Sequence, residues 1–68
     1  MNEDTLNLEI RRFLKKVGIT SQREVEGAVR KAISDGRLAG HERLAVKVTL
    51  EVRSLGVRHE IEDDIALE

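Results

Sequence analysis

The segment from Leu44 to Arg53 constrains the fold of this chain more than any other. Its even positions hold branched apolar residues, and its odd positions hold polar residues, charged residues or Ala. Successive side chains of a strand point to opposite faces, so this alternation predicts a β-strand over 44–53 with one apolar and one polar face. The rest of the chain must then supply elements that cover the apolar face.

A first helix is predicted over residues 3–17, where apolar side chains recur every three or four positions and form one stripe. Asn2 or Asp4 can cap its first turn, because short polar side chains accept hydrogen bonds from free backbone N–H groups there. Gly18 supplies the left-handed residue with which many helices end.

A second helix is predicted over residues 21–35, which carry their own apolar stripe. Ser21 and Glu24 have the spacing of a capping box, and Gly36 follows as a helix-ending residue. Only two or three residues separate this helix from the first, so the two helices are expected to be antiparallel neighbours.

The returning strand is predicted over 57–61, where the apolar residues stand at odd positions. Val52 and Val57 share the apolar face only if the turn between them has an even number of residues, as Arg53–Gly56 has. The same register sets the two remaining pairs of the hairpin, which are Leu50 with His59 and Val48 with Ile61.

Beyond this hairpin, Glu62–Asp64 has the composition of a turn, and Ile65–Leu67 can form a short third strand. The predicted architecture is α+β, with two antiparallel helices packed on one face of a two- to three-stranded antiparallel β-meander. Residues 1–68 are expected to form a single domain. The most buried side chains are expected in the middle of each stripe, at Phe13, Leu14, Val29, Val48 and Leu50.

The size of the chain favours self-association. It has 68 residues, no Cys and a single aromatic residue, Phe13. Small domains without disulfides or metals often gain stability as oligomers, so a homodimer is expected.

The absence of Cys fits a reducing compartment, and neither a leader nor an apolar run near 18 residues is present. We therefore expect a cytoplasmic protein without a membrane segment.

The charge distribution disfavours a dedicated nucleic-acid binder. Residues 1–37 hold eight Lys or Arg and six Asp or Glu, a net charge of +2, and residues 38–68 hold four and seven, a net charge of −3. Nucleic-acid-binding domains usually show a strong basic excess.

Two predicted helix faces carry basic residues that could contact a partner. On the first helix an apolar side chain, Leu8, is surrounded by cations, which suits an acidic partner or a phosphate, although a solvated helix face explains the same pattern. On the second helix Gly27 would let another backbone approach closely. The candidate interaction surface comprises Leu8, Arg11, Arg12, Lys15, Arg23, Gly27, Arg30 and Lys31.

A helix–turn–helix comparison is suggested by the link at Gly18, but it fails in detail. Aligning Gly18 with the turn glycine of that motif puts Glu24 and Gly27 where buried apolar residues are needed. Nucleic acid therefore stays a secondary expectation.

No residue pattern indicates catalysis or a cofactor. His59 lies close in sequence to the acidic residues of 60–64, but their spacing matches no calcium loop. His41 has no partner visible in the sequence, and no nucleophile elbow or phosphate-binding glycine loop is present. We expect no catalytic residue, no cofactor-binding residue, no metal ligand and no enzyme activity.

The segments Arg12–Glu24, His59–Glu60 and Ile65–Glu68 prompt a comparison with known families. Through them nearly the whole chain resembles a small family of uncharacterised bacterial proteins, a domain of unknown function. The resemblance implies a bacterial, cytoplasmic origin and assigns no catalytic or binding residue.

The function expected from these features is that of a small non-enzymatic protein-interaction module, with a protein partner or a second copy of itself. Association should use a sheet edge or the outer face of the second helix, because the edges of a narrow sheet keep open backbone groups. The alternative is a weak nucleic-acid or phosphate binder that uses the basic helix faces.

Overall fold

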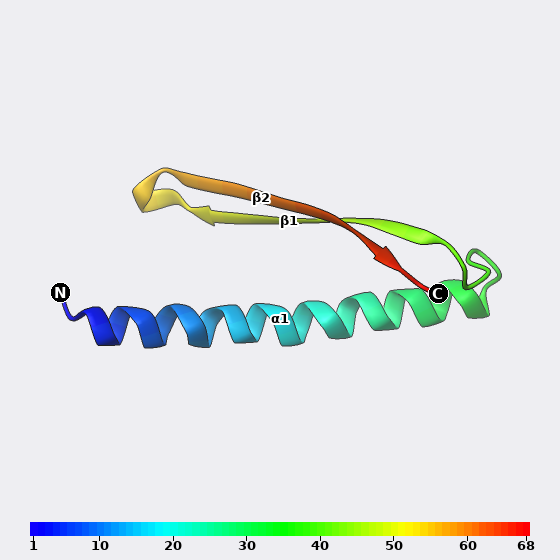
Figure 1. Cartoon of the computed structure of the whole chain (residues 1–68), viewed down its shortest axis with the longest axis horizontal. Coiled ribbons are helices and arrows are strands. Elements are labelled where there is room, and N and C mark those ends of the chain that lie inside the picture. The colour runs from blue at the N-terminus through cyan, green and yellow to red at the C-terminus, as the bar shows by residue number, and fades with distance from the viewer. The chain divides into compact units, whose positions relative to one another are not determined.

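The computed structural model describes all 68 residues and divides into two compact units, Met1–Arg37 and Leu38–Glu68. The first unit is a single helix, α1 (Glu3–Ser34). The second is a two-stranded antiparallel hairpin formed by β1 (Arg43–Val52) and β2 (Val57–Ala66), with one 3-10 turn, η1 (Arg53–Leu55), between the strands (Figure 1). The fold is α+β, but the predicted architecture of two antiparallel helices packed on a two- to three-stranded meander is wrong, because one long helix precedes a single hairpin.

The helix α1 runs without interruption through the segment where a break was predicted. Gly18 does not adopt a positive φ, and Thr20 donates a hydrogen bond from Oγ1 to the carbonyl of Lys16, 2.8 Å away. A Thr hydroxyl bonded four residues back is satisfied inside a helix and needs no cap position. Gly18 costs the helix roughly 1 kcal/mol relative to Ala, which is too little by itself to break a helix of 32 residues.

The apolar stripe of α1 explains why the helix continues. Its apolar positions 6, 14 and 17 are followed 11 residues later by apolar residues at 17, 25 and 28. An 11-residue repeat corresponds to about 3.67 residues per turn, close to the 3.6 of a straight α-helix. The stripe therefore stays on one side of α1 across Gly18, so one helix presents both predicted stripes together.

Both ends of α1 are capped as the sequence predicts. The Asn2 side chain accepts hydrogen bonds from the backbone N–H groups of Asp4 (2.9 Å) and Thr5 (3.1 Å). At the other end Gly36 has a φ of 78°, and the N–H groups of Gly36 and Arg37 bond to the carbonyls of Ile33 and Ala32. This pair of bonds is a Schellman motif, which ends the helix before the second unit.

The register of the hairpin is confirmed. Val52 pairs with Val57, Leu50 with His59 and Val48 with Ile61. The turn between them has four residues and closes with a bond from the N–H of Gly56 to the carbonyl of Arg53, at 3.1 Å. Gly56 has a φ of 67°, which a residue with a Cβ rarely adopts.

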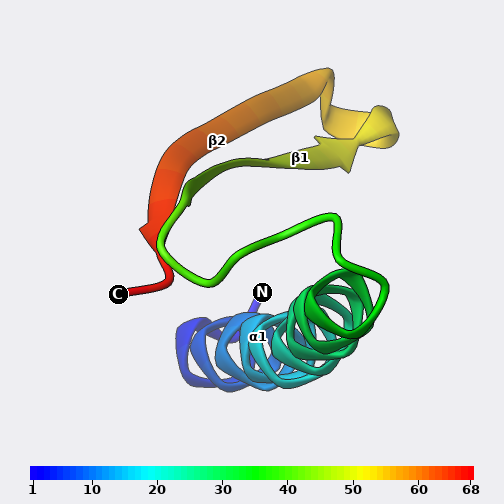
Figure 2. The same ribbon diagram turned by 90° about the vertical axis from the view of Figure 1, so that its right-hand side faces the viewer.

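The predicted turn at Glu62–Asp64 and the third strand at Ile65–Leu67 are wrong, because both segments belong to the end of β2. Pairing continues to Arg43 opposite Ala66, and the N–H of Leu67 extends it to the carbonyl of Glu42. The odd positions of β2 keep the same face throughout, so ten residues of β2 match ten of β1. The two strands twist about each other along this length (Figure 2).

Few side chains are buried. Ala32 is the only buried hydrophobic residue, at 8% exposure, whereas Phe13 is 46%, Leu14 is 51% and Val48 is 38% exposed. The predicted core at these three residues is therefore wrong, while Val29 and Leu50 are half-buried. The prediction assumed two helices covering a sheet, but one hairpin has too little width to form a core of its own.

Candidate interaction surfaces

The predicted interaction surface lies entirely on α1. At about 100° per residue, the 11- and 7-residue spacings of Arg12, Arg23 and Arg30 place these side chains within roughly 20° of one another around the helix. Leu8 and Lys15 lie on a neighbouring side, and all of these residues are exposed. The two basic faces that were predicted on separate helices thus become parts of one helix surface.

The remaining predicted residues lie around this strip. Gly27 lies beside Arg23 and Arg30 in this projection, and a Cβ added there would meet no atom within 4 Å. Arg11 lies towards the apolar stripe on one side and Lys31 towards it on the other. The structure therefore does not gather all eight residues into one site.

Two of the aligned arginines already have acidic neighbours. Arg12 Nε lies 2.9 Å from Glu9 Oε2, and Arg30 Nη1 lies 3.6 Å from Glu26 Oε2. Exposed pairs of this kind contribute roughly 0–1 kcal/mol, so they orient side chains more than they stabilise the helix. Arg23 makes no ion pair and is the free cation of this row.

The apolar stripe of α1 is open to solvent over its N-terminal half. Leu6, Ile10, Phe13 and Leu14 are all exposed large hydrophobic residues, whereas Val17, Val25 and Val29 are half-buried. Ala32 is the only buried member, near the C-terminal end. A stripe of branched and aromatic side chains this long is typical of a helix that packs against another surface.

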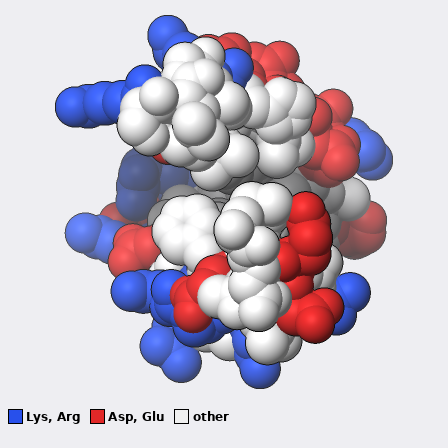
Figure 3. Space-filling view, turned by 90° about the vertical axis from the view of Figure 1, so that its left-hand side faces the viewer, with Lys and Arg blue, Asp and Glu red and all other residues white.

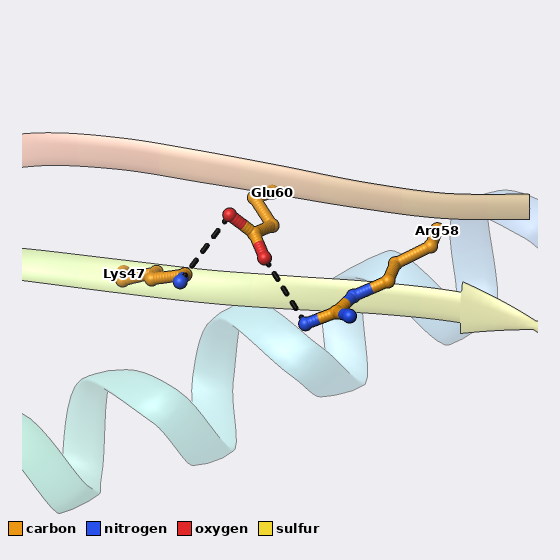
Figure 4. Close-up of polar contacts among 3 residues, drawn as sticks. All are labelled: Lys47, Arg58 and Glu60. Atoms are coloured by element: carbon orange, nitrogen blue, oxygen red, sulfur yellow. Dashed lines mark hydrogen bonds and ion pairs between the residues drawn. The ribbon is translucent and has the colours of Figure 1, made fainter.

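The polar face of the hairpin is a network of ion pairs. Glu60 lies between two cations, with Oε2 3.2 Å from Lys47 Nζ and Oε1 3.1 Å from Arg58 Nη2 (Figure 4). Glu51 and Arg53 form a longer pair of 3.6 Å at the end of β1. This face therefore pairs most of its charges locally and shows no excess of one sign.

The other face of the hairpin is apolar. It carries the even positions of β1 and the odd positions of β2, with two polar exceptions on β2, His59 opposite Leu50 and Asp63 opposite Val46. The acidic residues near His59 are consequently divided between two faces of β2.

A shallow hollow runs past Ala45–Lys47 and Glu62–Asp64. No group of three side chains that could hold a metal ion forms in the structure.

The two edges of the hairpin differ in charge and in free backbone groups. Residue 42 forms a hydrogen-bonded pair with Leu67, so the even residues of β1 bond to β2, and its odd residues direct their N–H and C=O groups outward. On β2 the outward N–H of Asp64 already donates to the Asp63 carboxylate at 2.7 Å. Acidic groups gather along one side of the hairpin unit, in the upper half of Figure 3.

A carboxylate also organises the loop before β1. Glu42 accepts hydrogen bonds from the backbone N–H groups of Ala39 (2.8 Å), Gly40 (2.9 Å) and His41 (3.1 Å). These bonds, with Ala39 the largest contributor, lower the pKa of Glu42 from 4.5 to about 2. The three N–H groups resemble an anion site, but the side chain of the loop itself fills it.

The chain matches, over residues 1–68, a family described as a family of unknown function (DUF6494). It belongs to DUF6494. The resemblance to a domain of unknown function is thereby confirmed over the whole chain. No curated protein and no solved structure matches this DUF6494 member. No helix in it combines the length and the apolar character that spanning a membrane requires.

The sequence did not show that the open edge of the hairpin belongs to β1. A sheet edge was predicted to associate, but the sequence pattern did not say which strand offers it. The missing information is the hydrogen bond within Asp63–Asp64, which occupies a donor of the β2 edge. The signal available in the sequence was the contrast between the acidic β2 segment and the β1 segment, which carries two cations and one anion.

Proposed function

We propose that this chain is a non-enzymatic protein-interaction module whose apolar surfaces are buried by association with a second copy of itself. The observation that carries the proposal is the exposure of large hydrophobic side chains within each unit, such as Phe13 (46%) on α1 and Ile61 (54%) on the hairpin.

Large hydrophobic residues are exposed on both units, from Leu6 to Leu14 on α1 and at Val48, Val57 and Ile61 on the hairpin. Contiguous apolar surfaces of this extent mark interaction sites on soluble proteins. The proposal also places the protein in the bacterial cytoplasm, in keeping with the family that its sequence resembles.

Sedimentation equilibrium over a wide range of protein concentrations tests the proposal. We expect the mass of two or more copies, with dissociation only on dilution, because burial of apolar surface drives the association. A chain that stays monomeric at about 1 mM, where even a weak dimer with a dissociation free energy of about 4 kcal/mol would form, overturns it.

A weak nucleic-acid or phosphate binder is the second candidate function. The observation that favours it is the alignment of Arg12, Arg23 and Arg30 along one continuous helix. The sequence pattern had predicted two separate helices for these residues. Binding to a DNA duplex should then fall steeply with salt, because phosphate contacts release counterions. Arg23→Gln should weaken such binding more than Lys31→Gln, because Lys31 lies away from the aligned arginines.

A further inference from the structure

We propose that two copies of this chain pair through the open edges of their β1 strands, antiparallel and centred on Thr49. The product is a four-stranded sheet in the order β2, β1, β1, β2. This inference rests on the proposed self-association and identifies the surface through which the two copies bind each other.

The first argument is the difference between the two edges. From Arg43 to Val52, β1 carries two cations and one anion, whereas β2 carries Arg58 against four acidic residues, Glu60, Glu62, Asp63 and Asp64. Two β2 edges would therefore repel each other. In addition, Asp63 occupies the outward N–H of Asp64, and inward-facing charges are a common device that protects a strand edge from pairing.

The second argument is symmetry. An antiparallel pair of identical strands has its two-fold axis perpendicular to the sheet, so the apolar faces of the two hairpins become continuous. Pairing β1 with β2 of a neighbour would leave an edge free at each end and would build open chains. Pairing β1 with β1 leaves only the two protected β2 edges, so the assembly closes as a dimer.

The third argument is charge complementarity, which selects one register. With the axis at Thr49, Lys47 lies opposite Glu51 of the second copy, and Glu51 lies opposite its Lys47. Thr49 lies opposite Thr49 of the second copy, and Val48 lies opposite its Leu50 on the apolar face. Opposite charges, Thr–Thr pairs and branched apolar pairs each favour a cross-strand contact.

The neighbouring registers are less complementary. An axis at Lys47 sets Arg43 against Glu51 on both sides but places two lysines opposite each other at its centre, and an axis at Glu51 places two glutamates opposite each other. An axis at Leu50 sets Lys47 against Arg53, and an axis at Val48 pairs no opposite charges. Like charges directly opposite are destabilising, so the Thr49 register is favoured.

The existing hairpin extends the same pattern across four strands. Arg58 lies opposite Glu51 within one hairpin, and Lys47 lies opposite Glu62. In the proposed dimer, one row across the polar face therefore reads Arg58, Glu51, then Lys47 and Glu62 of the second copy, with alternating charge. The central row carries Glu60, whose carboxylate is already neutralised by Lys47 and Arg58 (Figure 4).

Single-cysteine variants test this register, because the natural chain has no Cys. Thr49→Cys should form a disulfide-linked dimer in oxidised glutathione, since directly opposed residues have Cα atoms about 5.5 Å apart, within disulfide range. Lys47→Cys alone and Glu51→Cys alone should each give roughly tenfold less dimer, because identical positions then lie about 14 Å apart. A mixture of Lys47→Cys and Glu51→Cys should cross-link again, since it keeps the second Lys47–Glu51 pair.

Each other outcome overturns the inference and separates it from the proposed function. Strong cross-linking of Lys47→Cys alone, or of a mixture of Thr49→Cys with either other variant, identifies a different register. A chain that sediments as a dimer but cross-links at none of these positions associates through another surface, so the edge inference fails while the proposed function stands. A monomer that does not cross-link overturns both.

Discussion

His59 lies directly opposite Leu50 in the hairpin, so an imidazole shares a face with branched apolar side chains. We expect His59→Val to raise the free energy of unfolding by up to about 1 kcal/mol, because it completes an apolar cross-strand pair. Thermal melting followed by circular dichroism measures this change. Glu60→Val is the matched control on the polar face, where the same residue type removes the contacts to Lys47 and Arg58 and should give no such gain.

The continuity of α1 at Gly18 is directly testable. Gly18 is helical, and a Cβ added there would meet no atom within 4 Å. Gly18→Ala should therefore stabilise the chain by roughly 1 kcal/mol, as measured by thermal melting. Gly36→Ala should instead destabilise it, by roughly 1–2 kcal/mol, because Gly36 holds a φ of 78° at the helix end. Lower stability in Gly18→Ala would mean that the helix breaks there.

The Glu42 loop should respond to acid. The folded pKa of Glu42 is about 2, below its ordinary value of 4.5, so its hydrogen bonds stabilise the loop fully above pH 4.5. That contribution is lost as the pH falls from about 4.5 towards 2, because the protonated carboxyl no longer accepts these bonds equally well. Carboxyl NMR chemical shifts should report a midpoint near pH 2.

A substitution checks the same loop at neutral pH. Glu42→Gln should accelerate amide exchange at Ala39 and Gly40, whose N–H groups bond to this side chain. Glu51→Gln, which has no such role, should leave exchange at these two residues unchanged. Equal exchange rates in Glu42→Gln and the parent chain would contradict the assigned hydrogen bonds.

The hairpin register was predictable because side-chain alternation is a strict rule. Val52 and Val57 can share a face only with an even loop, and one pairing then sets all the others. The caps at Asn2 and Gly36 were predictable for a similar reason, since each satisfies backbone groups within a few residues of itself.

The break at Gly18 was predicted wrongly because local signals there compete with a longer pattern. Gly18, Thr20 and Ser21 each favour a helix end, but each is also tolerated inside a helix. The 11-residue repeat of the stripe decides the matter, and it becomes visible only across both halves of the helix. Glu62–Asp64 misled in the same way, because its composition suggests a turn while Ile61 and Ile65 place apolar side chains on the same face of one strand.

The predicted core failed at Phe13, Leu14 and Val48 for a different reason. A stripe shows which side chains prefer burial, but it does not show what covers them. The residues of the candidate surface on α1 are all exposed, whereas their grouping depended on the helix count. The choice of the β1 edge required hydrogen-bond geometry that no sequence pattern contains.

The apolar stripe of α1 provides the last test of association. Leu14 lies in the stripe and Leu8 on the other side of the same helix, and both are exposed. Leu14→Asp should weaken dimerisation at least about tenfold, because burial of a Leu side chain contributes roughly 1.5–3 kcal/mol. Leu8→Asp makes the same chemical change outside the stripe and should leave the dissociation constant within about a factor of two, consistent with the small effects of surface substitutions. Analytical ultracentrifugation measures both constants, and circular dichroism shows whether each variant keeps its helix. Equal weakening by the two variants would mean that the added charge, rather than the stripe, controls association.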